Sequence, residues 1–234
     1  MTILDMSGAA LETVSLNSYS GSPVAFLDHV ASPDARLEKP SAKQRLIVGI
    51  SGASGAVYGV RLLELLRAAG VETHLIMSNA AGITLAHEVG KPLSAVRALA
   101  DRSYGQKDLS APIASGSFRT AGMIIAPCSV RTMSGIAAGG AEGLLARAAD
   151  VVLKERRRLV LLLRETPLHL GHLRAMTTVT EMGAIIAPPV PAFYAKPTSL
   201  EQMVDYTLGR VLDLFDIEID LAGRWNGLRS AVME

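Results

Sequence analysis

From about residue 45 onwards, short apolar runs alternate with segments in which apolar residues recur every three or four positions. The five apolar runs, at 45–50, 71–77, 122–126, 159–163 and 184–187, are strand-sized and end at turn or polar residues. The segments at 56–69, 80–89, 132–138, 143–156, 169–182 and 199–215 show helical spacing. A less regular stretch, 91–120, carries several turn residues. The pattern predicts strands and helices in alternation.

This alternation sets the expected fold class. Strands separated by helices of this length are joined by crossover connections, which favour a parallel sheet. The predicted strands are continuously apolar, as in sheets that are covered on both faces. We therefore predict an α/β protein of three layers, with a parallel sheet between two layers of helices.

The chain divides unevenly along its length. Residues 1–44 are rich in Ser, Ala, Pro and Asp and show no sustained helical or strand period. We interpret them as an N-terminal extension that is mobile or draped on a neighbouring subunit. Residues 45–226 form the predicted domain, and residues 227–234 form a C-terminal tail. A chain of 234 residues is long enough for one well-buried core.

Composition narrows the function classes. The formal net charge is +1, which gives no electrostatic reason to expect nucleic acid or an anionic membrane as a partner. No apolar run is long enough to span a bilayer, and no secretory signal is evident. The single cysteine, Cys128, rules out an internal disulfide and fits a reducing compartment. We therefore expect a cytoplasmic protein.

The first predicted strand runs into a glycine-rich loop, Gly49-Ile50-Ser51-Gly52-Ala53-Ser54-Gly55. Such a loop before a helix lets backbone N–H groups approach a phosphate. A P-loop would need a Lys after the last glycine, where this chain has Ala56. A dinucleotide site would need a carboxylate after the next strand, which ends instead in Ser78. The loop thus favours a mononucleotide such as FMN; a tight turn without ligand is the alternative.

Polar residues follow each predicted strand, at the sheet edge where ligands of parallel α/β proteins bind. They are Ser51 to Gly55 after the first strand, Ser78 after the second, Ser129 to Thr132 after the third, Arg164 and Glu165 after the fourth, and Tyr194 beyond the fifth. An Arg in this position is suited to clamping a phosphate, and a Glu beside it to proton transfer. Their recurrence favours a ligand site over a purely structural explanation.

Several of these residues also have simpler explanations. Ser129 and Thr132 open a helix, so capping alone would explain them. Cys128 follows a buried strand without a neighbouring His, which favours a small core residue over a nucleophile. The basic run at 154–158 is typical of a solvated helix end. His169 and His172 lack an evident third ligand, so we expect no metal site.

Five motifs together resemble the UbiX family of flavin prenyltransferases. They are Gly49 to Gly55, Pro127-Cys128-Ser129, Ala148 to Arg157, Arg164-Glu165-Thr166-Pro167 and Pro191-Ala192-Phe193-Tyr194. The resemblance covers about residues 45–225. It implies a flavodoxin-like or Rossmann-like homo-oligomer, typically a dodecamer, with FMN bound between subunits.

The resemblance also implies a reaction. Members of this family join a dimethylallyl group from dimethylallyl monophosphate to N5 and C6 of reduced FMN, without a metal. The prenylated FMN then serves UbiD-type decarboxylases, in ubiquinone biosynthesis or in aromatic acid decarboxylation.

The same resemblance implies roles for individual residues. FMN would be contacted by Gly52, Ala53, Ser54, Ser78, Ser129, Val130, Arg131, Thr132 and Arg164. The prenyl phosphate would be held by Lys154, Tyr194 and Arg210, with Arg147 as a further candidate. Glu165 and Glu88 would assist proton movement, and Ser54 would lie near the leaving oxygen. Fixed cations near a departing phosphate are what such a reaction requires.

Two other functions fit parts of the sequence. FMN-dependent cysteine decarboxylases share the expected fold but carry a Pro-Ala-Ser-Ala-Asn-Thr motif. The nearest equivalent here, Pro112 to Ser117, lacks the Asn. A non-catalytic FMN carrier would need the glycine loop but would have no use for Lys154, Tyr194 and Arg210 together.

Overall fold

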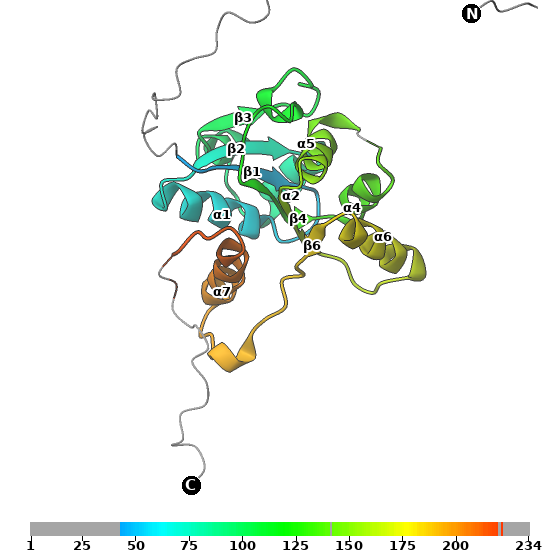
Figure 1. The fold of residues 1–234 in the computed structure, drawn as a ribbon. Helices are drawn as coiled ribbons and strands as arrows, with labels where there is room; N and C mark the ends of the chain where they lie inside the picture. The colour runs from blue at the N-terminus through cyan, green and yellow to red at the C-terminus, as the bar shows by residue number, and fades with distance from the viewer. Residues whose placement is uncertain (1–42, 141, 220, 222–234) are drawn as a thin grey trace, which may run out of the picture. The chain divides into compact units, whose positions relative to one another are not determined.

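The computed structural model describes residues 43–140, 142–219 and 221 (Figure 1). Almost all of the predicted N-terminal extension, and the whole predicted C-terminal tail, lie outside the described residues. Within the described part, no helix is both long enough and apolar enough to cross a membrane.

A single sheet of six parallel strands forms the centre of the described part, as predicted in class. In chain order the strands are β1 (Arg45–Ile50), β2 (Glu72–Met77), β3 (Arg102–Tyr104), β4 (Gly122–Cys128), β5 (Arg158–Leu163) and β6 (Ala184–Ile186). Their order across the sheet is β3-β2-β1-β4-β5-β6. The chain builds outwards from β1 on one side and from β4 on the other, so the order reverses between these two strands. In sheets of this kind, ligands bind at that reversal.

Helices connect the strands. They are α1 (Ala56–Ala68), α2 (Asn79–Glu88), α3 (Leu93–Arg97), α4 (Val130–Ala137), α5 (Gly143–Lys154), α6 (Leu170–Glu181) and α7 (Leu200–Asp213), with 3₁₀ turns η1 (Pro112–Ala114) and η2 (Phe193–Ala195). The helices predicted from apolar spacing all form, with ends within two residues of those expected. Glycines in the left-handed region mark two ends of this pattern: Gly55 precedes α1 at φ 99°, and Gly70 follows it at φ 71°.

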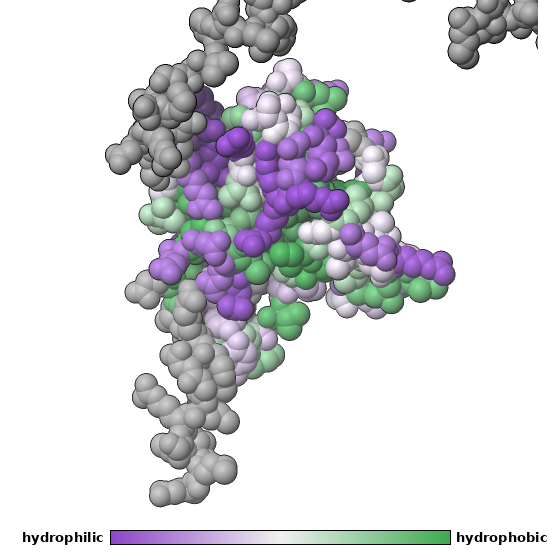
Figure 2. Space-filling model, in the orientation of Figure 1, coloured by the Kyte–Doolittle hydropathy of each residue, from purple (hydrophilic) through white to green (hydrophobic). Residues whose placement is uncertain are grey.

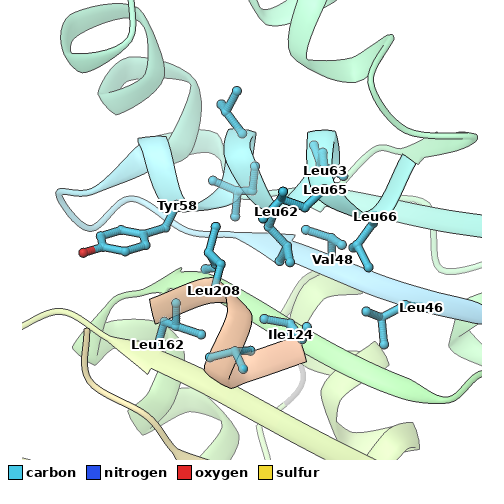
Figure 3. Packing of buried hydrophobic residues seen from close by; sticks show 14 of the residues in the cluster. Leu46, Val48, Tyr58, Leu62, Leu63, Leu65, Leu66, Ile124, Leu162 and Leu208 are labelled. Carbon is cyan, nitrogen blue, oxygen red and sulfur yellow. The ribbon is translucent and has the colours of Figure 1, made fainter. Parts of the chain in front are cut away.

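The sheet separates two apolar layers. Side chains alternate along each strand, so Leu46 and Val48 of β1 pack with α1 and α7, whereas Ile47 packs with α4 and α5 on the opposite face. Figure 3 shows the first layer, in which α1 leucines meet Ile124, Leu162 and Leu208. Each leucine buried in this way contributes about 1.5–3 kcal/mol.

Helix α1 lies unusually close to the sheet. A β-carbon on Gly59 would be 2.4 Å from the carbonyl oxygen of Ala126 and 2.7 Å from Ile50. The bidentate pair between Arg61 and Asp205 then ties α7 to α1, with N–O distances of 2.7 and 3.0 Å. This pairing fixes the outer helix of the layer.

Two details differ from the sequence-based prediction. The irregular stretch at 91–120 contains the edge strand β3, which is only three residues long and polar. Strand β4 continues through Pro127 to Cys128 instead of ending at the proline, with a shift in register between Ile125 and Cys128. A proline is tolerated at such an irregularity because no ladder hydrogen bond from its nitrogen is needed there.

Candidate active site

The loops after β1 and β4 are locked together by a buried serine. Ser51 is completely buried, and its hydroxyl donates to the carbonyl of Pro127 at 2.8 Å. The Ser51 hydroxyl oxygen also accepts the backbone N–H of Ser129 at 2.7 Å. The backbone N–H of Ser51 donates to the carbonyl of Pro127 as well. These hydrogen bonds fix the two loops at the reversal of strand order relative to each other.

The N-terminus of α1 already holds an anion. The Glu88 carboxylate, from the end of α2, accepts the N–H groups of Gly55 and Ala56, both at 2.8 Å. A carboxylate is favoured there by the partial positive charge of the helix end. The sequence suggested this helix end as part of a phosphate cradle. In the structure its first two N–H groups are bound within the chain.

The surroundings of Glu88 keep it ionised. Burial alone would raise the pKa of this carboxyl. The hydrogen bonds from Ser54, Ala56 and Gly55, together with the charge of Arg164, outweigh burial and hold the pKa below its usual value. Glu88 is therefore a carboxylate at neutral pH.

Arg164 completes this cluster from the end of β5. Its backbone N–H donates to the carbonyl of Cys128 at 3.0 Å. Its guanidinium lies against the glycine loop, with Nε 3.5 Å from where a β-carbon on Gly55 would be. The structure therefore brings together Ser54, Glu88 and Arg164, which are distant in sequence. They combine a hydroxyl, a carboxylate and a fixed cation.

A cavity of about 740 Å³ opens beside these loops. Its lining includes the predicted flavin contacts Gly52, Ser78, Ser129, Arg131 and Thr132. Ser78 caps α2 by accepting the N–H of Ala81, and Ser129 caps α4 by accepting the N–H of Thr132, both at 3.2 Å. Capping and cavity lining are thus done by the same serines.

The rest of the lining comes from segments that the sequence did not single out. Gln106 and Lys107 follow the unpredicted strand β3, and Glu142, Gly143 and Leu145 open α5. The Gln106 side chain accepts the N–H of Leu145 at 2.9 Å and so caps α5. No local motif marks Gln106, because its partner is a helix N-terminus nearly forty residues further along the chain.

The cavity fits a flavin mononucleotide in size and chemistry. Its volume lies within the range of about 300–1,000 Å³ usual for small-molecule sites. Glycine and alanine residues (Gly52, Ala80, Gly135, Ala146) leave flat space for a ring. Ser129 and Thr132 supply hydroxyls, and the exposed Lys107 and Arg131 supply cations for a phosphate.

The basic residues predicted to hold a prenyl phosphate lie elsewhere in the chain. Lys154 ends α5 just before β5, whereas Arg164 directly follows β5. The six-residue strand therefore separates them by about 20 Å. Arg147 is two turns before Lys154 on the same side of α5 and pairs with Asp150 at 2.7 Å.

Tyr194 and Arg210 form a third group. Tyr194 lies on η2 and hydrogen-bonds Tyr206 of α7, with the two rings at 88° to each other. Arg210 is one turn further along α7 and pairs with Asp213 at 2.8 Å. Helix α7 covers the opposite face of the sheet from α5. One chain therefore does not bring Tyr194 and Arg210 together with Lys154.

Large hydrophobic side chains are exposed on α6 and on the segment between β6 and α7. Figure 2 shows them along the lower side of α6 and on the segment between β6 and α7. Exposed large hydrophobic residues in this part of the chain are Leu168, Leu170, Leu173, Val190, Phe193, Tyr194 and Leu200. Apolar side chains grouped in this way are typical of surfaces that contact another protein.

Three remaining candidates have local explanations in the structure. Cys128 is fully buried, and burial raises the pKa of its thiol to about 12, so it is a core residue and not a nucleophile. Glu165 is exposed and accepts the N–H of Thr166. His169 caps the first turn of α6 and lies against His172, with ring centroids 3.5 Å apart. Among the described residues, no cluster of three potential metal ligands includes these histidines.

Comparison with known proteins now identifies the family. The flavoprotein family model matches residues 34–212. The flavin prenyltransferase UbiX of Escherichia coli K12 is 59% identical over 187 residues, which cover 79% of this chain and 99% of the relative. The chain belongs to the UbiX family of flavin prenyltransferases.

Solved UbiX structures have the same fold as this chain. A UbiX protein (PadA1) in complex with FMN and dimethylallyl pyrophosphate is 50% identical, has a TM-score of 0.79, and matches 80% of this chain and all of that one. A dodecameric, FMN-dependent UbiX-like decarboxylase of Escherichia coli O157:H7 is also 50% identical, with a TM-score of 0.77 over 79% of this chain and 100% of that one. The flavodoxin-like, Rossmann-like fold expected from the resemblance is confirmed.

Proposed function

We propose that the protein joins a dimethylallyl group from dimethylallyl monophosphate to N5 and C6 of reduced FMN, which makes it a prenyltransferase. The observation that carries this proposal is the cavity at the reversal of strand order, beside the cluster of Ser54, Glu88 and Arg164. The 59% identity to a flavin prenyltransferase over nearly its whole length supports the same reaction.

FMN would occupy the cavity. We propose as its contacts Gly52, Ala53, Ser54, Ser78, Ser129, Val130, Arg131, Thr132 and Arg164. When bound, reduced FMN supplies the electron-rich N5 and C6 atoms that take the prenyl group. The chain's contribution is to hold the ring in the cavity, and the Ser51 hydrogen bonds keep two of the contacting loops in place before binding.

Proton movement is assigned to residues beside the cavity. Glu88 accepts a hydrogen bond from the Ser54 hydroxyl, so we propose that it assists proton movement by orienting that hydroxyl, its own lowered pKa making it a weak base. Ser54 would also lie near the oxygen that leaves with the phosphate. Glu165, next to Arg164, is the second carboxylate that we propose for proton transfer. Its exposure in one chain leaves room for a donor to approach.

The prenyl phosphate would be held by residues of more than one copy. Lys154 and Arg147 lie on one face of the sheet, and Tyr194 and Arg210 on the other, so no single chain offers all four. We therefore propose a homo-oligomer, a dodecamer like that of the Escherichia coli O157:H7 relative, in which neighbouring copies complete each site. Cations fixed there would stabilise the charge that develops on the departing phosphate.

The product would pass to a UbiD-type decarboxylase, and the protein would act in the cytoplasm. The single cysteine is compatible with a reducing compartment. The cysteine decarboxylase alternative is disfavoured because the Pro112 to Ser117 segment lacks the Asn of that motif. In this segment, the carbonyl of Ala114 accepts a hydrogen bond from Arg147 of α5, and the carbonyl of Gly116 accepts one from Arg157, just after α5.

Anaerobic turnover tests the proposal. Purified full-length protein with reduced FMN and dimethylallyl monophosphate should give a flavin heavier by one prenyl unit in mass spectrometry. Dimethylallyl diphosphate in a parallel reaction decides between the two donors. Protein that binds both ligands but returns only unmodified FMN would be a carrier, and the enzyme proposal would be wrong.

A further inference from the structure

Arg157 holds the segment 116–118 against the end of α5. Arg157 donates from one terminal nitrogen to the carbonyl of Phe118 at 2.8 Å and from the other to the carbonyl of Gly116 at 2.6 Å. Only 17% of its side chain is exposed. The sequence suggested a solvated basic run here, and for Arg157 that interpretation is wrong. Its side chain is largely buried and binds two backbone carbonyls of the segment.

The segment held by Arg157 lies against Lys154, one of the residues proposed to bind the phosphate. A β-carbon on Gly116 would be 2.9 Å from Nζ of Lys154 and 2.1 Å from a carboxylate oxygen of Glu155. Lys154 and Glu155 form an ion pair with each other, and Glu155 also lies 3.9 Å from Arg157. The missing side chain of Gly116 therefore leaves the space in which the Lys154 ammonium is held.

Hydroxyl groups flank this glycine. Ser115 and Ser117 are exposed, and their hydroxyl oxygens lie 3.0 Å apart, within hydrogen-bonding distance. Arg147 reaches the residue before Ser115, donating to the carbonyl of Ala114 at 3.3 Å. Two hydroxyls beside an ammonium and a guanidinium are suited to the oxygens of a phosphate monoester.

We propose that Arg157 is a positioning residue for the phosphate of the prenyl donor, and that Gly116 and the hydroxyls of Ser115 and Ser117 belong to that subsite. This proposal rests on the proposed function, because it takes Lys154 as a phosphate ligand. Arg157 acts through the backbone: by fixing two carbonyls it sets the position of Gly116, and Gly116 sets the position of Lys154. A planar guanidinium reaches two carbonyls at once, which a lysine ammonium in its place would not do in the same geometry.

Binding of the donor to two variants tests this proposal. Full-length, FMN-loaded protein would be titrated calorimetrically with dimethylallyl monophosphate, as wild type, Arg157→Lys and Gly116→Ala. We expect both variants to raise the Kd of the donor about tenfold, the effect of losing one charge-assisted contact. The Kd of FMN should stay unchanged, because neither Arg157 nor Gly116 lines the cavity. Arg119→Lys, at an exposed arginine next to the same segment, is the matched control and should leave both constants unchanged.

The two variants separate positioning from folding. Gly116→Ala keeps both Arg157 hydrogen bonds and displaces only the mobile ends of Lys154 and Glu155, so its melting temperature should match wild type. A donor Kd within twofold of wild type in either variant would overturn the proposal. So would a parallel loss of FMN affinity, which would indicate a general structural role. Wild-type protein that binds the donor but makes no prenylated flavin would refute the proposed reaction and leave this binding test in force.

Discussion

The two ends of β5 carry opposite kinds of functional residue. At its carboxyl end, Arg164 joins Ser54 and Glu88 in a cluster whose members already bind one another. At its amino end, Lys154 lies on the outside of the molecule, with nearly half of its side chain exposed and an ion pair to its sequence neighbour Glu155. The first cluster is complete within one chain, whereas the second offers its cation outwards.

This difference shows how the site divides its work. Residues that orient a flavin gain from rigidity, since a bound ring must keep one position. Lys154, at the far end of α5, lies too far from Arg164 and the glycine loop to act beside them in the same chain. We infer that the carboxyl end of the sheet is a prepared half-site and that α5 supplies the other half to a neighbouring copy.

The largest expected effect comes from mixing two damaged copies. Lys154→Ala should lower the turnover rate about a hundredfold, the usual effect of losing a cation at a developing charge. Arg164→Ala should lower it strongly as well, because a flavin contact and the partner charge of Glu88 are lost. Co-expressed with different affinity tags, the two variants should recover about a quarter of wild-type activity. In a random mixture, about one site in four takes Arg164 from one variant and Lys154 from the other, and is therefore intact. Prenylated flavin measured by mass spectrometry gives the result.

A mixture of two variants that are both altered on α5 is the control for this experiment. Lys154→Ala mixed with Arg147→Ala should recover nothing, because both changes lie on α5 and every site then carries one of them. Recovery in this control, or none in the first mixture although both subunits co-purify, would show that the two ends of β5 do not combine across copies.

A smaller effect is expected from loosening the prepared half. Ser51→Ala leaves the part-buried N–H of Ser129 without its acceptor and should lower the free energy of unfolding by about 1–3 kcal/mol. FMN affinity should fall as well, because two contacting loops lose their lock. Urea unfolding and flavin fluorescence titration measure the two changes. Ser94→Ala, at an exposed serine on α3, should change stability by less than about 0.5 kcal/mol, and an equal loss in both variants would contradict this account.

The smallest effect concerns the Glu88 cap and its pH dependence. Glu88→Gln should lower stability at pH 7 by about 0.5–1 kcal/mol, the range for a partly exposed helix cap. The pKa of Glu88 is lowered in the folded state, so its stabilising effect is full above the unfolded value of about 4.3. It is lost as the pH falls through the lower, folded value.

Melting temperatures of wild type and Glu88→Gln between pH 7 and pH 3 check this sign. The two curves should converge at the acidic end. A gap that stays constant to pH 3 would mean that the charge of Glu88 does not contribute. Glu181→Gln, at an exposed carboxylate near the end of α6, serves as the control.

Local pattern was sufficient for most of the fold. The apolar runs predicted five of the six strands, and Gly55 and Gly70 bounded α1 as expected. Strand β3 was not predicted, because three polar residues at a sheet edge give no periodic hydrophobic signal. Gln106 and Lys107, which follow β3 into the cavity, were missed for the same reason.

The sequence suggested candidate members of the site but not how they are arranged. The family resemblance pointed to Ser54, Glu88 and Arg164, yet only the structure shows that the Glu88 carboxylate binds the start of α1, more than thirty positions earlier. Arg157 looked like one of several solvated basic residues, because its two carbonyl partners lie about forty positions away. Contacts made across the fold in this way leave no trace in local spacing.

The exposed hydrophobic residues of α6 and of the segment after β6 have a consequence for how the protein will behave in dilution. Burying side chains such as Leu170, Val190 and Phe193 against another copy would couple folding to mass action. The melting temperature would then rise with protein concentration. Expression level and dilution would thus act on this enzyme as a ligand acts on others.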